Sequence, residues 1–286
     1  MRTILQLFFL IFLSTNLSAQ DSTSGKTIFW EISGNGLSAP SYLYGTTHFI
    51  CEKDVIFSDT VKAKMASCKA FYKEVMFDGD TAALVEVRPA GITLKKIIDR
   101  NDFRRLQKFF ASNPSINDSV LNATSVYNLE RMMMEEIGKC KITSIDKQLY
   151  LLAREDGLSL NGLENAEDVN NKKDRASLSE QAIYVNNLIT NIDKIAMRLR
   201  IEIGFYYSGN IDKLYNLYAF DARGTKTNFA IDMGDKRNRN WIPVIENAIR
   251  QGPTFIAFGC MHLPSGTGII NLLREKGYTV RPLYYY

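Results

Sequence analysis

The hydrophobic positions near the start of the chain favour short strands and helices in alternation. Thr27–Ile32 and Ser41–Tyr44 are rich in β-branched and aromatic residues, and Gly34-Asn35-Gly36 between them predicts a hairpin. Ser58–Ser67 carries apolar residues at helical spacing. Ala70–Phe77 is an apolar run with a Lys-Glu pair inside it, and it predicts a buried strand.

The middle of the chain, about residues 94–220, has apolar residues at three- and four-residue spacing, which predicts amphipathic helices. One strand-like run, Leu158–Glu164, interrupts this portion after Gly157, a residue suited to end the preceding helix. The polar stretch Asn165–Arg175 predicts a loop or an exposed helix start. The expected helices are Leu94–Ile98, Phe103–Phe110, Val126–Ile137, Lys147–Arg154, Ser179–Ile203 and Ile211–Tyr218.

The end of the chain returns to helix and strand in alternation. Asn240–Arg250 and Gly266–Lys276 have helical patterns, and Thr254–Phe258 and Tyr278–Leu283 are strand-like. The whole pattern predicts an α/β fold: a central, mostly parallel sheet flanked by helices, with a large helical insertion in the middle of the chain. The length suits a single domain over residues 21–286.

The first twenty residues have the layout of a secretory signal peptide. Arg2 precedes the apolar run Ile4–Leu13, and Leu17-Ser18-Ala19 supplies the small residues that precede a cleavage site. The run is shorter than the roughly 20 helical residues that span a bilayer, so we expect residues 1–20 to be removed. The remainder is then exported to the periplasm or secreted, without a membrane span. The alternative is an uncleaved N-terminal anchor.

Charge and cysteine content narrow the classes of partner and site. The chain has 35 Lys and Arg against 31 Asp and Glu. This excess of positive charge is too small to indicate a protein that binds nucleic acid. No two cysteines have CxxC spacing, which argues against a zinc ribbon or a thioredoxin-type site. In an oxidising compartment the cysteines allow three complete pairings, and a link from Cys51 to Cys68, across a short loop, is the first to test. The cysteines are Cys51, Cys68, Cys140 and Cys260.

The only two histidines stand in the same local pattern. Each of His48 and His262 closes a Gly-x-x-His turn directly after an apolar strand-like run. Ligands of parallel α/β sheets bind beyond the carboxyl ends of the strands, so two histidines placed there are able to share one site. The alternative is that each histidine is a packed or surface residue without a role.

Two glutamates and one arginine are candidates for the same site. Glu74 lies inside an apolar run and Glu164 ends one, and a buried carboxylate needs a partner charge or a metal ion. The alternatives are a salt bridge or an edge strand for Glu74, and an exposed strand end or a helix start for Glu164. Arg237 is able to bind a carboxylate or an oxyanion, or else belongs to a solvated turn. Asp146, at the start of a predicted helix, is most simply an N-cap.

Together these motifs resemble the TraB/GumN family over nearly all of the chain after the signal peptide. Members of its Tiki type are metal-dependent peptidases with the Gly-x-x-His histidines and an acidic residue at the active site, which implies such roles for His48, His262 and Glu74. The fold is shared with relatives that resemble erythromycin esterases and haem-binding ChaN-like proteins, so the fold does not fix the function. The matching segments are Phe29–Ile32, Tyr42–His48, Leu160–Glu164, Arg237-Asn238, Trp241, Phe258–Leu263, Gly266-x-Gly268 and Gly277-Tyr278.

The resulting hypothesis is an exported metal-dependent hydrolase, a peptidase acting on a peptide or protein substrate. His48, His262, Glu74 and Glu164 would hold one divalent zinc, manganese or cobalt ion that activates a water molecule. Glu74 would also take the proton of that water, and Arg237 would stabilise charge on the substrate oxygen. Two alternatives stay open. One is a non-catalytic protein that binds a metal, haem or a peptide, and the other is a thiol hydrolase that uses Cys260 with His262.

Overall fold

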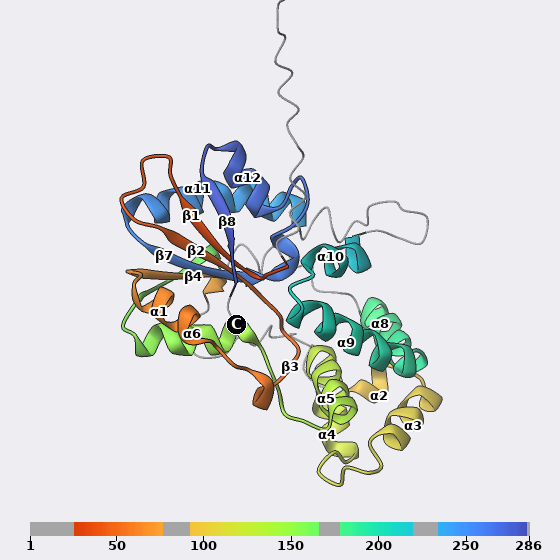
Figure 1. The fold of residues 1–286 in the computed structure, drawn as a ribbon. Coiled ribbons are helices and arrows are strands. Elements are labelled where there is room, and N and C mark those ends of the chain that lie inside the picture. Colours follow the sequence, from red (N-terminus) through yellow and green to blue (C-terminus); the bar gives the residue numbers. More distant parts are fainter. Residues whose placement is uncertain (1–25, 77–91, 166–177, 220–233, 285–286) are drawn as a thin grey trace, which may run out of the picture.

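A computed structural model describes residues 26–76, 92–165, 178–219 and 234–284 (Figure 1). Its central sheet has the strand order β6-β4-β7-β2-β1-β8. The four neighbouring strands β6, β4, β7 and β2 are parallel, and β1 is antiparallel to both of its neighbours. The predicted mostly parallel sheet and the predicted hairpin are therefore confirmed. The strands are β1 (Phe29–Ser33), β2 (Ser41–Thr46), β4 (Ala70–Met76), β6 (Ser159–Asn165), β7 (Thr254–Gly259) and β8 (Thr279–Leu283).

Helices cover both faces of this sheet, as Figure 1 shows. Helices α1 (Asp59–Ala66) and α6 (Ile145–Glu155) lie on one face, and α11 (Lys236–Gln251) and α12 (Ile269–Glu275) lie on the other. The strand β7 is buried over almost its whole length, as its continuous apolar sequence predicts for a strand covered on both faces. Its Phe255 ring packs against rings from β1, β2 and β4. One apolar core therefore unites the sheet and its covering helices.

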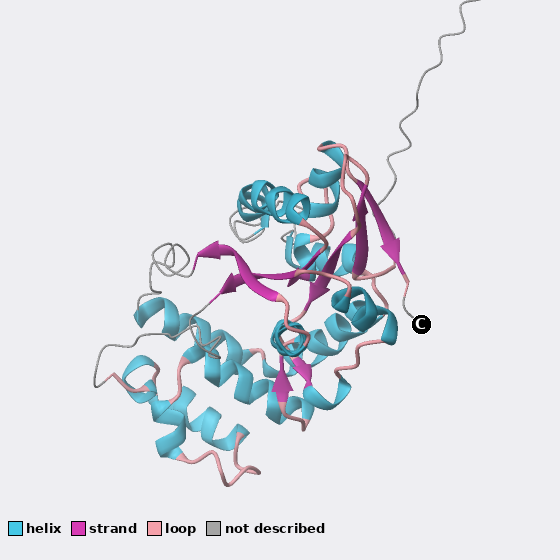
Figure 2. Ribbon diagram, turned by 90° about the vertical axis from the view of Figure 1, so that its left-hand side faces the viewer, coloured by secondary structure: helices cyan, strands magenta, loops and turns pink. Residues whose placement is uncertain are grey.

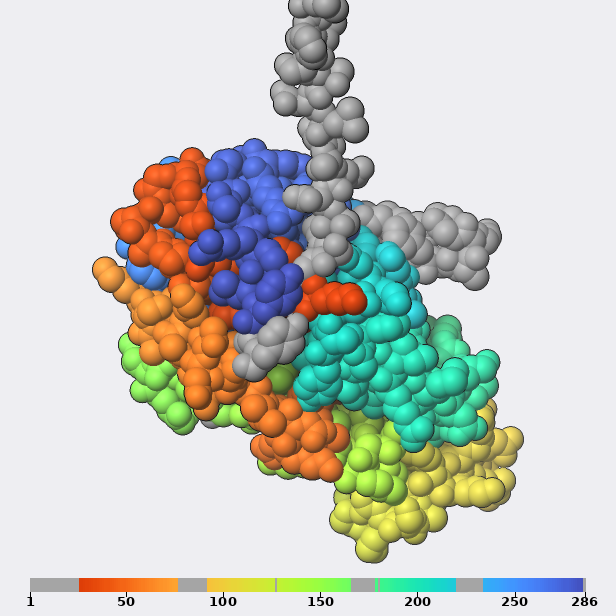
Figure 3. All heavy atoms as spheres, in the orientation of Figure 1, coloured from red at the N-terminus to blue at the C-terminus, as the bar shows by residue number. Residues whose placement is uncertain are grey.

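The middle of the chain forms a helical region beside the sheet (Figure 2), which in the space-filling view is a distinct lobe (Figure 3). It has a core of its own, built from apolar side chains of α2, α3, α4, α5 and α8. The predicted helical insertion is confirmed, with α6 and β6 returning to the sheet inside it. The expected helix Ser179–Ile203 is in fact two helices that meet at Asn191. The helices are α2 (Leu94–Ile97), α3 (Arg100–Phe109), α4 (Asp118–Ala123), α5 (Val126–Gly138), α8 (Leu178–Thr190), α9 (Ile192–Tyr207) and α10 (Ile211–Ala219).

A disulfide joins Cys51 to Cys140, so the expected link between Cys51 and Cys68 is wrong. Cys51 ends the two-residue strand β3 (Ile50–Cys51), which pairs with β5 (Ile142–Thr143) and so approaches Cys140. Cys68 is buried behind the end of α1, where its thiol donates to the carbonyl of Lys64. Strand pairing across a long sequence separation, which no spacing rule reveals, decides the disulfide.

Within the described residues, no helix has the length and apolarity that a membrane crossing requires. The predicted signal peptide, residues 1–20, lies outside the described residues, as does the predicted polar loop from residue 166 onward.

Candidate functional site

The predicted site residues come together at the carboxyl ends of four neighbouring parallel strands. His48 follows β2, Glu74 lies near the end of β4, Glu164 lies near the end of β6, and His262 ends the short turn of 3-10 helix that follows β7. Arg237 approaches them from the first turn of α11. The strand order brings these segments side by side, although nearly the whole length of the chain separates the two histidines.

Glu74 occupies the centre of the cluster. Its Oε1 accepts a hydrogen bond from the backbone N–H of Gly259 at 2.8 Å and lies 3.9 Å from Nε2 of His262. Its Oε2 accepts from Nη2 of Arg237 at 2.7 Å. Because β4 lies between two other strands, the edge-strand alternative for Glu74 is wrong, whereas the salt-bridge alternative describes one of its contacts.

Arg237 links the two glutamates. Its Nε donates to Oε1 of Glu164 at 2.6 Å, and the indole N–H of Trp241 donates to the same oxygen at 2.6 Å. The guanidinium also lies over the Trp241 ring, 4.6 Å from its centroid, in a cation–π contact. Helix α11 begins at Lys236, earlier than the expected Asn240, so Arg237 is a partly buried helical residue and does not belong to a solvated turn. Glu164 is likewise largely buried, so the alternative of an exposed strand end is wrong.

The glycines of the two Gly-x-x-His turns are required by close approaches. A Cβ at Gly45 would lie 2.7 Å from Leu263 and 2.8 Å from the Cβ of Cys260, so the first turn packs directly on the second. A Cβ at Gly259 would lie 3.3 Å from Oε1 of Glu74 and 3.8 Å from the ring of His262. The motif therefore has a physical basis: its glycines let one turn contact the other and let a backbone N–H reach a carboxylate.

His48 is held by a carboxylate on a different element. Its Nδ1 lies 3.1 Å from Oδ2 of Asp146, in the first turn of α6, and Asp146 also accepts from the hydroxyl of Thr46 at 2.6 Å. The Asp146 charge raises the pKa of His48 above its usual 6.5, to about 9, against the opposing effect of burial. The ring is nevertheless the more exposed of the two, with 56% of its side chain accessible. Nε2 of His48 has no partner in the part of the chain that the structure describes.

His262 is held by an amide instead. Its Nδ1 lies 2.6 Å from Oδ1 of Asn238, and its ring packs against the indole of Trp241. Burial lowers the pKa of His262 to about 4, although the charge of Glu74 opposes that shift. At neutral pH the ring is uncharged, and because Asn238 Oδ1 is an acceptor, Nδ1 carries the proton. The lone pair of Nε2 then faces Glu74.

Glu74 is ionised at neutral pH. Burial alone would raise its pKa. The charge of His262, which is protonated at the low pH where Glu74 titrates, and the charges of Arg237 and His48 lower it to about 2, and the Gly259 N–H acts in the same direction. His48 is thus close enough for its charge to act on Glu74. The arrangement places an anionic carboxylate among two imidazoles and a guanidinium.

Three contributors were not assigned these roles from the sequence. Asp146 was expected to be an N-cap, but the side chain of Ser144 caps α6, which leaves Asp146 to contact His48. Asn238 and Trp241 belong to segments that resemble the family. Their contacts with His262 and Glu164 are visible only in the folded structure. Their position on α11, one and four residues after Arg237, was the only available signal.

Cys260 does not have the surroundings of a nucleophile. Its side chain is buried, and burial raises the pKa of its thiol to about 12. A neutral, buried thiol is a poor nucleophile, so the site does not favour the thiol hydrolase alternative.

The donor atoms of the site are of the kinds that bind a divalent ion. Nδ1 of His262 is hydrogen-bonded to Oδ1 of Asn238, and Nδ1 of His48 forms an ion pair with Oδ2 of Asp146 at 3.1 Å, so each ring turns its Nδ1 to an oxygen and leaves Nε2 for another ligand, as metal-binding histidines do. However, among the described residues no three His, Cys, Asp or Glu side chains are arranged to hold one ion. Glu164 is bound to Arg237 and Trp241, so its contacts favour a role in holding Arg237. The two imidazoles and Glu74 fit an ion by their chemistry.

The chain matches the model of the TraB/PrgY/gumN family over residues 28–282. That range contains every residue of the site. No curated protein and no solved structure matches the chain.

Proposed function

We propose that this chain, which belongs to the TraB/PrgY/gumN family, is an exported metal-dependent hydrolase that cleaves peptide bonds. One observation carries the proposal. Two histidines at neighbouring strand ends turn Nδ1 to an oxygen of Asp146 or Asn238, which leaves Nε2 of each for a ligand, and Nε2 of His262 lies 3.9 Å from the ionised carboxylate of Glu74. Export is supported by the signal-like first residues and by the Cys51–Cys140 disulfide, which suits an oxidising compartment.

In this proposal Nε2 of His48, Nε2 of His262 and the carboxylate of Glu74 hold a zinc, manganese or cobalt ion. A bound ion of this kind lowers the pKa of a water ligand from about 15.7 to about 7, which makes hydroxide accessible at neutral pH. Glu164 acts through Arg237 as a positioning residue and contributes no ligand.

The residues of the chain carry out the proton transfer and the charge stabilisation. Glu74 accepts the proton of the attacking water and passes it to the leaving amine. Its low pKa makes it a weak base, so it holds that proton only briefly. Arg237 keeps Nε and Nη2 on the two glutamates, and its Nη1 group is available to donate to the substrate carbonyl oxygen.

A second function is favoured by one specific observation. Two imidazoles whose charges act on the carboxylate of Glu74 would equally suit a protein that binds a metal, haem or a peptide without turnover. Such a protein would bind its ligand in a fixed ratio and release it unchanged.

The decisive experiment compares the mature protein, purified without a histidine tag, with a His48→Ala, His262→Ala double variant. Metal content is measured by mass spectrometry, and hydrolysis is measured on a broad peptide library with manganese, cobalt or zinc supplied. The proposal predicts bound metal and cleavage in the wild type and neither in the variant. Circular dichroism of the variant should match that of the wild type, which excludes unfolding.

Two results would contradict the hydrolase. Cleavage that persists unchanged in the double variant would remove the histidines from the reaction. Metal bound through the histidines, with no cleavage of any peptide in the library, would leave the non-catalytic binding protein.

A further inference from the structure

The segment that carries His48 is paired with the segment that carries Asp146. The strands β3 and β5 form a two-stranded ribbon in which Ile50 lies opposite Thr143. On the other side of His48, the backbone N–H of Ile145 donates to the carbonyl of Thr47 at 2.9 Å. The residues before and after His48 are therefore both hydrogen-bonded through the backbone to the segment 142–145.

The disulfide closes the far end of this ribbon. Cys51 and Cys140 are 89 residues apart in sequence, and their Cα atoms are 5.6 Å apart. Beside the disulfide, the N–H of Glu52 donates to the carbonyl of Lys141 at 2.8 Å. The disulfide also ties the ribbon to the end of α5, because Cys140 directly follows Lys139, the C-cap of this helix.

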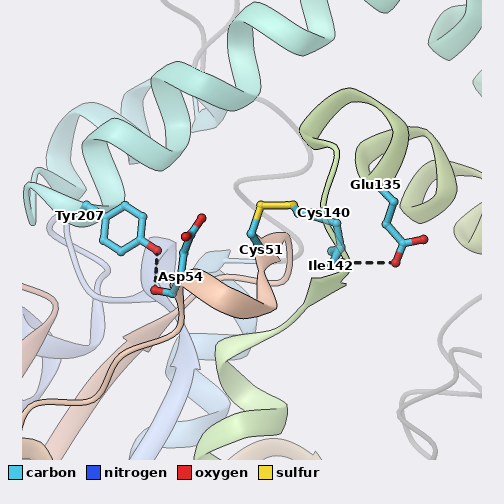
Figure 4. The surroundings of a disulfide bond; sticks show 6 residues. All are labelled: Cys51, Asp54, Glu135, Cys140, Ile142 and Tyr207. Atoms are coloured by element: carbon cyan, nitrogen blue, oxygen red, sulfur yellow. Dashed lines mark hydrogen bonds between the residues drawn. A yellow bond between two sulfur atoms is a disulfide. The ribbon is translucent and has the colours of Figure 1, made fainter.

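Figure 4 shows two further contacts beside the disulfide. Glu135 of α5 accepts a hydrogen bond from the N–H of Ile142 at 3.2 Å, and the Tyr207 hydroxyl of α9 donates to the carbonyl of Asp54 at 3.0 Å. The helical region thus contacts the ribbon on the side of β5 and on the side of the segment after β3.

The orientation of the His48 ring depends on this ribbon, whereas packing holds the ring of His262. Its side chain is 56% exposed, so packing does little to fix the ring, whereas the side chain of His262 is only 10% exposed. Within the described residues, the polar side-chain contact of the His48 ring is the ion pair of its Nδ1 with Oδ2 of Asp146 at 3.1 Å. Asp146 lies in the first turn of α6, whose N-cap Ser144 directly follows β5. The register of the ribbon therefore sets where Asp146 meets the ring.

We propose that the Cys51–Cys140 disulfide is a positioning device for the site: it locks the β3–β5 ribbon and so keeps Asp146 against Nδ1 of His48. Cys51, Cys140 and Asp146 are positioning residues that act through His48. The orientation of the ring follows from the contacts alone, and only its consequence for metal binding rests on the proposed function.

The test uses the two histidine rings as internal reporters in the metal-free mature protein. Long-range proton–nitrogen NMR correlations are recorded at one pH for the wild type, for Asp146→Asn and for a Cys51→Ser, Cys140→Ser double variant. Cys68→Ser, which removes a free and buried thiol, is the matched control. The ring signals of His48 should move in the double variant towards their positions in Asp146→Asn. The ring signals of His262 should stay in place, and the control should match the wild type.

Cobalt affinity supplies the second measurement. Loss of a residue that orients a metal-binding histidine weakens metal binding by about 10- to 100-fold, and we expect that loss in Asp146→Asn and in the double variant. If the wild type binds no cobalt, the proposed function fails while the NMR comparison still tests the positioning.

Unmoved His48 signals in a folded double variant would overturn the inference. If the double variant does not fold, the Asp146→Asn protein with its intact disulfide decides. His48 signals unchanged there would show that Asp146 does not orient the ring, and the inference would fall with it.

Discussion

The two Gly-x-x-His turns have the same sequence pattern and lie at the ends of neighbouring parallel strands, but they hold their histidines in opposite environments. His48 is exposed and faces the carboxylate of Asp146, which raises its pKa. His262 is buried, faces the amide of Asn238, and has a lowered pKa. Near neutral pH the first ring is protonated and the second is not.

The difference shows that the motif fixes the position of each ring but not its charge: the Asp146 carboxylate raises the pKa of His48, whereas burial lowers the pKa of His262. Each partner comes from a helix outside the motif, Asp146 from α6 and Asn238 from α11. A protonated His48 must lose its proton before Nε2 can bind a cation, whereas a neutral His262 is ready to bind. Cation binding at neutral pH would therefore release a proton from His48 and none from His262.

The largest effect is expected for Glu74→Gln, because Glu74 lies next to His262 and is within the electrostatic reach of His48. An amide cannot accept the proton of the attacking water, so kcat should fall by about 10²- to 10⁴-fold. Steady-state kinetics on a peptide substrate measure the loss. Glu164→Gln is the matched control, with a smaller loss that enters through Arg237. Equal kcat in wild type and Glu74→Gln would exclude Glu74 as the base.

The two motif glycines should respond differently to alanine. Gly45→Ala forces a methyl group against Cys260 and Leu263, and overpacking of this kind costs about 1–3 kcal/mol of unfolding free energy. Gly259→Ala meets looser contacts and should cost less stability, but it pushes on Glu74 and His262 and should lower kcat/KM by at least about tenfold. Urea unfolding and kinetics of both variants separate the two effects. If the same variant lost more unfolding free energy and more kcat/KM, the two glycines would not differ in role.

Exchanging the partners should reverse the contrast between the histidines. In Asn238→Asp a carboxylate faces His262, so its pKa should rise from about 4. In Asp146→Asn the raising charge is gone, so the pKa of His48 should fall from about 9. With only two histidines in the chain, NMR titration assigns both directly. Unchanged pKa values in the two variants would mean that burial, and not the partner, sets the contrast.

The same shifts give stability a dependence on pH with two opposite signs. His262 has a lowered pKa, so the unfolded chain binds more protons below 6.5, and its contribution is lost as pH falls from 6.5 towards 4. His48 has a raised pKa, so its contribution is complete below 6.5 and is lost as pH rises towards 9. Urea unfolding across this range tests both, with His262→Gln and His48→Gln each expected to flatten one side only.

The smallest effect is expected for Cys260→Ala, inside the second motif. The thiol is buried and neutral, so kcat/KM should change by less than about threefold. A loss comparable to that of Glu74→Gln would instead revive the thiol hydrolase. Kinetics measured beside that variant make the comparison direct.

Much of the fold could be predicted because its strands and helices have strong local patterns. The strands β4 and β7 and the amphipathic helix α5 lie close to their predicted bounds, although β4, predicted to be buried, is buried only at Phe71 and Val75. The break at Asn191 between α8 and α9 was not predicted, because apolar spacing continues across it. The short strands β3 and β5 were also missed, since two residues carry no periodic signal.

The sequence by itself determined which residues lie at the strand ends. His48 and His262 follow apolar runs, Glu164 ends one and Glu74 lies inside one, and a parallel sheet brings the carboxyl ends of such runs to one edge. Hydrophobic alternation is local, so it can be read without knowledge of the fold.

Only the tertiary structure decided what each of these residues contacts. The Asp146 partner of His48, the Asn238 partner of His262 and the Cys51–Cys140 disulfide all join segments far apart in the chain. Such contacts depend on strand order, register and helix placement, which the whole core sets together. For that reason the histidines of two copies of one short motif differ in charge at neutral pH, one protonated and one neutral.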